Sequence, residues 1–111
     1  MAVNHYETVY IADPGISEAK LGELNNKISD IVKRFQGTVN GAEDWGSRRL
    51  GYKINKQTTG HYVRVHYTAE PGAISEIERT LQLRDDILKQ LTIRLEENER
   101  RTNEKRTDEG R

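Results

Sequence analysis

The clearest pattern in the chain is an alternation of apolar and other residues between positions 49 and 67. Its apolar members are Leu50, Tyr52 and Ile54 in a first segment and Val63, Val65 and Tyr67 in a second. The residues between them are Arg49, Gly51 and Lys53, and then Tyr62, Arg64 and His66. A period of two predicts two β-strands, each buried on one side. The polar segment Asn55–Gly60 predicts the turn that joins them into a hairpin.

Two other segments have the three-to-four-residue spacing of amphipathic helices. The first lies between Ser17, a good N-cap, and Gly37, a typical helix stop. Its apolar residues are Leu21, Leu24, Ile28, Ile31, Val32 and Phe35. The second follows the break at Glu70-Pro71-Gly72 and has its apolar residues at Ile74, Ile77 and Leu81.

Strand-like segments complete the pattern at both ends and before the hairpin. His5–Ala12 is rich in β-forming residues and ends at Asp13-Pro14-Gly15. Thr38–Asn40 begins the second strand of the chain, which leads to the hairpin, and Gly41 marks a bulge or kink in it. Ile87–Leu95 predicts a last strand, with Leu91, Ile93 and Leu95 on one side and Gln90, Thr92 and Arg94 on the other.

The resulting order is strand, helix, strand, strand, helix, strand. This order predicts an α+β fold of the ferredoxin-like, split βαβ kind, with a four-stranded antiparallel sheet and two helices on one face. The other face of the sheet stays open. The residues expected there are Arg49, Lys53, Tyr62, Arg64, His66, Thr92 and Arg94. We therefore expect a sheet that is apolar on one face and basic on the other, which would suit a polyanion.

Composition adds bounds to this picture. With 111 residues the chain is long enough for one domain, which we predict to span residues 1–96. Residues 97–111 carry many charges and no apolar stripe, and predict a disordered C-terminal tail. The absence of cysteine excludes disulfides and cysteine-bound zinc. No apolar run approaches the roughly 20 residues of a membrane span, and the N-terminus lacks signal-peptide character, so we expect a cytoplasmic protein without a membrane partner.

The formal net charge is zero, so any basic site must come from local segregation of charge. No acidic residue occurs in the 25 residues from Trp45 to Ala69. Within that stretch lie Arg48, Arg49, Lys53 and Lys56. The Arg48-Arg49 pair is compatible with a solvated strand edge, where charge deters edge pairing, and equally with phosphate contact.

Signals of catalysis are poor. The three histidines, His5, His61 and His66, lack metal-ligand spacing, and the adjacent acids Glu43-Asp44 and Asp85-Asp86 point to opposite sides of an extended chain. No glycine-rich phosphate loop is present. We therefore expect no enzyme, no cofactor, no metal and no small-molecule substrate.

Four blocks together resemble the bacterial small-subunit ribosomal protein S six family. They are His5-Tyr6-Glu7, the segment from Trp45 to Ile54, Thr59-Gly60-His61-Tyr62, and Leu83-Arg84-Asp85. The resemblance covers about residues 4–95. The family's central block is usually Gly-x-Arg-Arg/Lys-Leu-Ala-Tyr-Pro-Ile, so that Gly51 stands here for alanine and Lys53 for proline, and both departures are compatible with a strand.

The resemblance implies a structural constituent of the small ribosomal subunit. Such a protein binds the central domain of small-subunit ribosomal RNA together with ribosomal protein S eighteen during assembly. The residues that we assign to RNA are Tyr6, Arg48, Arg49, Lys53, Arg84 and Arg94. Lys53 and Arg94 are included because we expect them on the open face of the sheet. Those that we assign to the partner protein are Trp45, Tyr52, Tyr62 and Arg64.

Two other classes of function remain open at the level of sequence. A small-molecule regulatory or enzymatic ferredoxin-like domain would need an anion loop or converging catalytic groups. A pure protein-interaction module could use the open sheet face and a strand edge, and is not exclusive of RNA binding. Replacing Arg48 and Arg49 by glutamate separates an RNA-binding protein from such a module.

Overall fold

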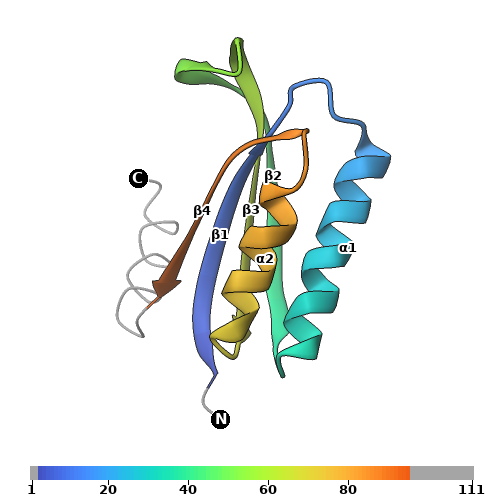
Figure 1. The fold of residues 1–111 in the computed structure, drawn as a ribbon, viewed down its shortest axis with the longest axis vertical. Helices are drawn as coiled ribbons and strands as arrows, with labels where there is room; N and C mark the ends of the chain where they lie inside the picture. Colours follow the sequence, from blue (N-terminus) through green and yellow to red (C-terminus); the bar gives the residue numbers. More distant parts are fainter. Residues whose placement is uncertain (1–2, 96–111) are drawn as a thin grey trace.

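The computed structural model describes residues 3–95, and their six elements follow the predicted order. These elements are β1 (Asn4–Ala12), α1 (Glu18–Arg34), β2 (Thr38–Ile54), β3 (Gln57–Ala69), α2 (Gly72–Gln82) and β4 (Ile87–Leu95). The strands form one antiparallel sheet in the order β2-β3-β1-β4, and both helices cover the same face of it (Figure 1). The predicted ferredoxin-like fold is confirmed. The proposed tail, residues 97–111, lies outside the described residues.

The main core lies between the helices and the sheet. From the sheet it receives alternate residues of β1 and β3, among them Tyr10, Val63 and Tyr67. From α1 come the predicted Leu21, Leu24, Ile28, Ile31 and Val32, and from α2 the predicted Ile77 and Leu81. Ala73 of α2 is also buried, whereas the predicted Phe35 and Ile74 are only partly buried and pack against the core. No described helix is both long enough and apolar enough to span a bilayer.

The ends of α1 follow local rules. Ser17 caps the first turn, since its hydroxyl accepts a hydrogen bond from the backbone N–H of Lys20. At the other end Gln36 adopts the left-handed conformation (φ 64°), which glycine more often occupies. Gly37 follows it, and is needed for another reason: a Cβ there would overlap the Thr68 carbonyl oxygen.

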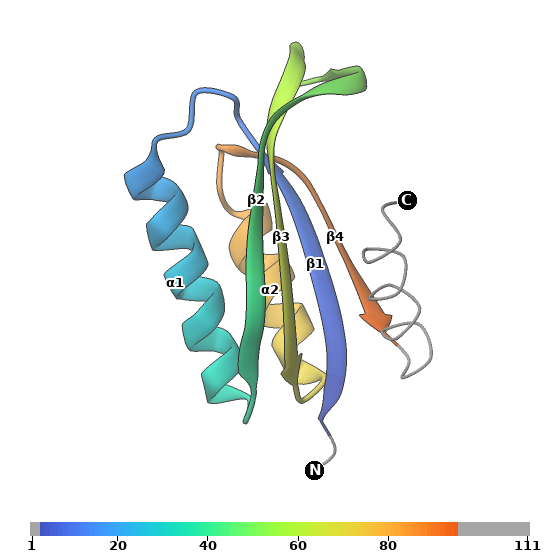
Figure 2. The same ribbon diagram turned by 180° about the vertical axis from the view of Figure 1, so that it is seen from behind.

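The hairpin between β2 and β3 extends past the ends of the helices (Figures 1 and 2). Its turn consists of Asn55 and Lys56, both with positive φ, a conformation that matches the twist of paired strands. The predicted turn was therefore too long, because residues 57–60 already belong to β3. Tyr52 was expected on a buried side, but 63% of it is exposed. The bulge expected at Gly41 is confirmed by a register shift between Val39 and Gly41.

The orientation predicted for β4 is wrong. Thr92 lies opposite Thr8 and Arg94 opposite Tyr6, so both share the helix-covered side with those core residues. The Thr8 hydroxyl is 2.8 Å from the Thr92 hydroxyl and 2.9 Å from the Tyr67 hydroxyl. Directly paired residues point to the same side of a sheet. Leu91 pairs with Val9 and Ile93 with Glu7, so both face the open side instead.

Candidate functional site: the open sheet face and the hairpin

The open face of the sheet, seen in Figure 2, is defined here through the strand register. It includes Glu7, Val9 and Ile11 of β1, Glu43 and Arg48 of β2, Tyr62, Arg64 and His66 of β3, and Lys89, Leu91 and Ile93 of β4. Of the seven residues predicted for this face, only the three of β3 are confirmed by the register. Arg49 pairs with Thr59 and lies on the opposite side of the ribbon from Arg48, and Lys53 falls in an irregular part of the hairpin.

An ion-pair cluster occupies the centre of the open face. Arg64 of β3 donates to Glu7 of β1 (Nη2–Oε1 2.8 Å) and to Glu43 of β2 (Nη1–Oε1 3.3 Å). Burial disfavours the charge of Arg64, but these two carboxylates outweigh it and raise its pKa. One guanidinium between two carboxylates leaves no net positive charge here. The prediction of a basic open face is therefore wrong for the centre of that face.

Apolar side chains lie along the β4 side of the open face. Leu91 and Ile93 are 61% and 42% exposed, and Val9 of β1 lies opposite Leu91 in the register. These residues were missed as site candidates because the alternation of β4 was assigned to the core the other way round. An exposed apolar row of this kind is a typical feature of a protein-interaction surface.

An aromatic stack lies on the β2 side of the same face. Trp45 sits in a second register shift of β2, between Asp44 and Gly46. Its ring centroid is 6.5 Å from that of Tyr62, with only 18° between the ring planes, and the Arg48 guanidinium carbon is 5.8 Å from the Trp45 centroid. Trp45 is 40% exposed, so the stack is accessible.

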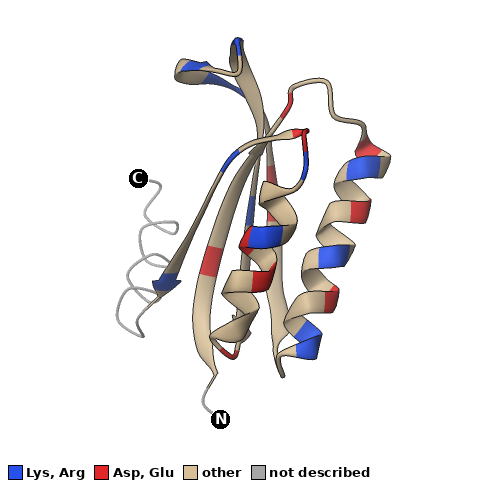
Figure 3. Ribbon diagram, viewed as in Figure 1, with Lys and Arg blue, Asp and Glu red and all other residues tan. Residues whose placement is uncertain are grey.

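Four cations lie on the hairpin, at one end of this face. Figure 3 shows Lys and Arg on the hairpin with no Asp or Glu among them. The cations are Arg48, Arg49, Lys53 and Lys56, and none of them forms an ion pair with another residue of the described chain. Lys89 of β4 donates to the Tyr52 hydroxyl (2.8 Å), and this hydrogen bond raises the pKa of Lys89. The basic region is thus concentrated at one end of the molecule.

The other predicted RNA residues lie apart from the hairpin. Arg84, after α2, makes two 2.9 Å hydrogen bonds to Asp86, which lower the pKa of that carboxyl. Tyr6 is only 4% exposed, and its ring packs against Tyr67. Arg94 lies opposite Tyr6, which in turn lies opposite Tyr67, so it is at the end of the sheet that is far from the hairpin turn.

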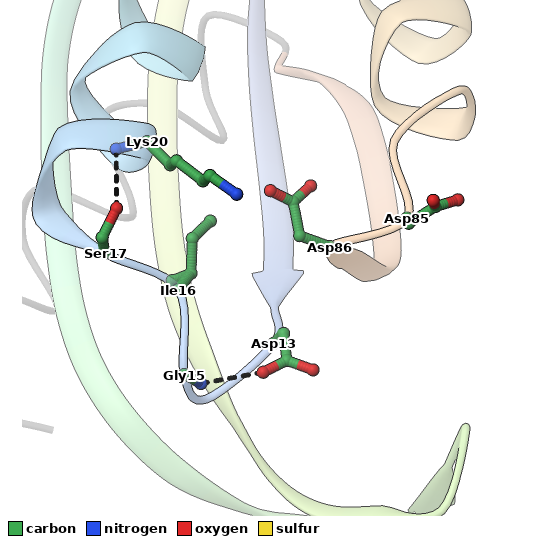
Figure 4. A pocket seen from close by; sticks show the side chains of 7 residues that line it. All are labelled: Asp13, Gly15, Ile16, Ser17, Lys20, Asp85 and Asp86. Carbon is green, nitrogen blue, oxygen red and sulfur yellow. Dashed lines mark hydrogen bonds between the residues drawn. The ribbon is translucent and has the colours of Figure 1, made fainter.

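A hollow beside the start of α1 is a candidate small-molecule site (Figure 4). Its volume is about 340 Å³, near the lower limit of ligand pockets, and Asp13, Asp85 and Asp86 contribute three carboxylates. Asp13 accepts from the backbone N–H of Gly15, and Asp86 holds Arg84, so two of the three are already engaged. Within residues 3–95 no three metal-ligating side chains, these carboxylates included, are arranged so that they could hold a metal ion. The hollow gives no support to the regulatory or enzymatic alternative.

Comparison with known proteins identifies the family of the chain. The family model described as ribosomal protein S6 matches residues 5–94. The chain belongs to the ribosomal protein S6 family. It is thereby a structural protein of the small ribosomal subunit and of the cytoplasm, not an enzyme, as the sequence resemblance predicted.

Individual S6 relatives support this assignment. Small ribosomal subunit protein bS6 of Geobacter metallireducens is 38% identical over 85% of this chain and 80% of its own length. The bS6 protein of Alkaliphilus oremlandii is 36% identical over 85% of this chain and 99% of its own. Each match spans 94 residues and so reaches far beyond the central motif.

Solved structures support the fold. The crystal structure of 30S ribosomal protein S6 from Thermotoga maritima superposes with a TM-score of 0.78 at 21% identity, covering 95% of this chain and 99% of the other. The C-terminal domain of the MgtC protein from Mycobacterium tuberculosis reaches 0.60 at 11% identity, over 86% and 90% of the two chains. Since such a different protein shares this S6 fold, the arrangement of strands does not identify a binding site.

Proposed function

We propose that the protein binds the central domain of small-subunit ribosomal RNA through its hairpin, and does so together with ribosomal protein S eighteen. The observation that carries the proposal is the group of four hairpin cations without carboxylate partners in the described chain. A guanidinium fork matches phosphate oxygens, and cations on a projecting hairpin can approach two strands of folded RNA.

Within the RNA site the hairpin residues Arg48, Arg49 and Lys53 take the leading role, and Lys56 joins them. Arg84 and Arg94 are secondary candidates, since Arg84 is held by Asp86 and Arg94 lies at the far end of β4. Tyr6 acts through packing, because a ring that is 4% exposed presents almost no surface to RNA.

The partner protein occupies the open face in this proposal. Arg64 lies there, and the exposed apolar side chains Leu91 and Ile93 extend the surface towards β4. Tyr52, assigned to the partner from sequence, lies on the hairpin beside Lys89. A neutral chain binds RNA weakly by itself, so a second, more basic chain would complete the RNA site and produce partner-dependent affinity.

The test compares two double charge reversals that change the net charge equally. Arg48→Glu with Arg49→Glu alters the hairpin, whereas Lys27→Glu with Lys33→Glu alters the exposed side of α1. We expect the hairpin variant to lose at least tenfold in affinity for a central-domain RNA fragment while it still binds the partner. The helix variant should retain both interactions. Loss of partner binding with unchanged RNA binding would contradict the proposal and favour an interaction module.

A further inference from the structure

The bulge in β2 determines where Trp45 points. Asp44 pairs with Val63 on the helix-covered side, and Gly46 pairs with Tyr62 on the open side, so Trp45 is the extra residue between two consecutive partners. Gly46 has a φ of 74°, which a side chain would disfavour. A β-bulge interrupts the ladder and is often found where a side chain must be redirected.

Side chains around the bulge hold this geometry. The Asp44 carboxylate accepts from the Gly46 backbone N–H (2.8 Å) and also contacts His61 Nε2 (2.6 Å). Trp45 donates its indole N–H to Glu43 Oε1 at 3.0 Å. This hydrogen bond, aided by the charge of Arg64 and opposed by slight burial, lowers the pKa of Glu43.

The Trp45 ring is therefore both fixed and accessible. Its polar atom already has a partner, so the exposed part of the ring offers a π surface rather than a hydrogen bond. Tyr62 supports it from the neighbouring strand in a nearly parallel orientation. Because the platform exists before any ligand binds, a ligand would pay little to order it.

The surroundings of the stack indicate the chemistry of its ligand. Arg48 lies over the Trp45 ring, and the other hairpin cations follow within eight residues along the chain. The nearest acids are already engaged, Glu43 by Arg64 and Asp44 by His61. A flat π surface next to a guanidinium matches a nucleobase joined to its phosphate.

We propose that Trp45, supported by Tyr62, stacks on one unpaired nucleobase of RNA, while Arg48 contacts the phosphate of the same nucleotide. This inference rests on the proposed RNA-binding function, and gives to RNA two residues that the sequence had assigned to the partner protein. A partner side chain is the less favoured occupant here. The exposed apolar residues that suit a protein lie on β4, which β1 and β3 separate from β2.

The test uses two RNA hairpins that differ only in one unpaired adenosine within the stem. Trp45 is the single tryptophan of the chain, so its fluorescence reports directly on stacking. At low salt, where weak binding is measurable, the unpaired adenosine should quench the emission and raise the affinity of the full chain about tenfold. Trp45→Ala should abolish this preference, and Trp45→Phe should retain most of it.

Controls separate this inference from the function on which it rests. Arg49→Ala should weaken binding to both RNAs by the same factor, since Arg49 lies on the other side of the ribbon. No binding of either RNA by the wild-type chain would contradict both proposals. Equal binding of the two RNAs, or an unchanged preference in Trp45→Ala, would overturn the stacking inference alone. Loss of partner binding in Trp45→Ala with an unchanged RNA preference would assign the stack to the protein partner.

Discussion

At the residue scale, a glycine just before β2 and a glycine near the hairpin end of β2 experience opposite constraints. A Cβ on Gly37 would collide with the backbone of Thr68 and Ala69, whereas a Cβ on Gly51 would meet no atom within 4 Å. We expect Gly37→Ala to lower the free energy of unfolding by about 2 kcal/mol or more, because backbone must move. Gly51→Ala should raise it by about 0.5 kcal/mol, because alanine restricts the unfolded chain more than glycine.

Denaturant unfolding of the two variants measures this difference directly. Each variant is the matched control of the other, since both add one methyl group. Similar losses in both would contradict the geometry of β2 around Gly51, and an unchanged Gly37→Ala would contradict the close approach to β3.

The ion pair of Arg84 and Asp86 predicts a pH dependence. The hydrogen bonds from Arg84 lower the pKa of Asp86 in the folded state. A lowered folded pKa stabilises the protein above the unfolded value of about 3.9, and this contribution is lost as pH falls through the folded value. Asp86→Asn should therefore be less stable than wild type by about 1 kcal/mol at pH 7, and this difference should shrink as pH falls below the unfolded value.

Thermal or denaturant unfolding across this pH range tests the ion pair. Asp85→Asn is the matched control, because Asp85 is exposed and has no ion pair within the described chain. It should leave the free energy of unfolding unchanged at pH 7. An Asp86→Asn variant with a constant deficit at every pH would mean that packing, not charge, is responsible.

At the scale of elements, periodicity was sufficient to predict the number, type and order of helices and strands. It was not sufficient to orient β4. Alternation divides a strand into two sides but does not say which side faces the core. In an edge strand the polar side can face the core if its polar groups form hydrogen bonds there. The hydroxyls of Thr8, Thr92 and Tyr67 do this here, so apolar Leu91 and Ile93 remain outside.

Bulges limited the prediction of the site in a similar way. One extra residue at Trp45 changes which later residues of β2 face the open side, so that Arg48 is found there and Arg49 is not. Gly46 is the only local signal of this shift, and a glycine alone does not locate a bulge. The hairpin cations could be recognised from the acid-free segment, whereas the stack over Trp45 required the register.

The exposed side of β4 leads to a prediction at the element scale. Leu91→Ser combined with Ile93→Ser should change the free energy of unfolding by about 1 kcal/mol or less, since 61% of Leu91 and 42% of Ile93 are already exposed. The same variant should weaken binding of the partner protein at least tenfold if the partner covers this row.

A core variant provides the contrast for β4. Leu81→Ala, at a fully buried position of α2, should cost about 2–5 kcal/mol without acting on the partner surface. A large loss of stability in the β4 variant would show that these side chains belong to the core. Unchanged partner binding would move the partner away from the β4 side of the open face.

At the scale of the whole molecule, neutrality and local charge have different consequences. The chain carries 18 basic and 18 acidic residues, so its long-range attraction to RNA is small. Its hairpin nevertheless places four cations together at one end, away from the ion pairs of the open face. We therefore expect weak binding of RNA by the isolated chain and a large gain with the partner.

Salt dependence measures how many of these cations act on RNA. The affinity of the complex for RNA should fall as the salt concentration rises, and a plot of the two logarithms gives a slope. If all four hairpin cations contact phosphates, this slope should be steeper by about 3 than that of a variant that lacks all four. Lys53→Ala should reduce the slope by about 1, whereas Lys27→Ala on α1 should leave it unchanged. An unchanged slope in Lys53→Ala would remove that residue from the RNA site. Tight, salt-sensitive binding by the isolated chain would contradict the partner dependence, because the hairpin alone would then suffice.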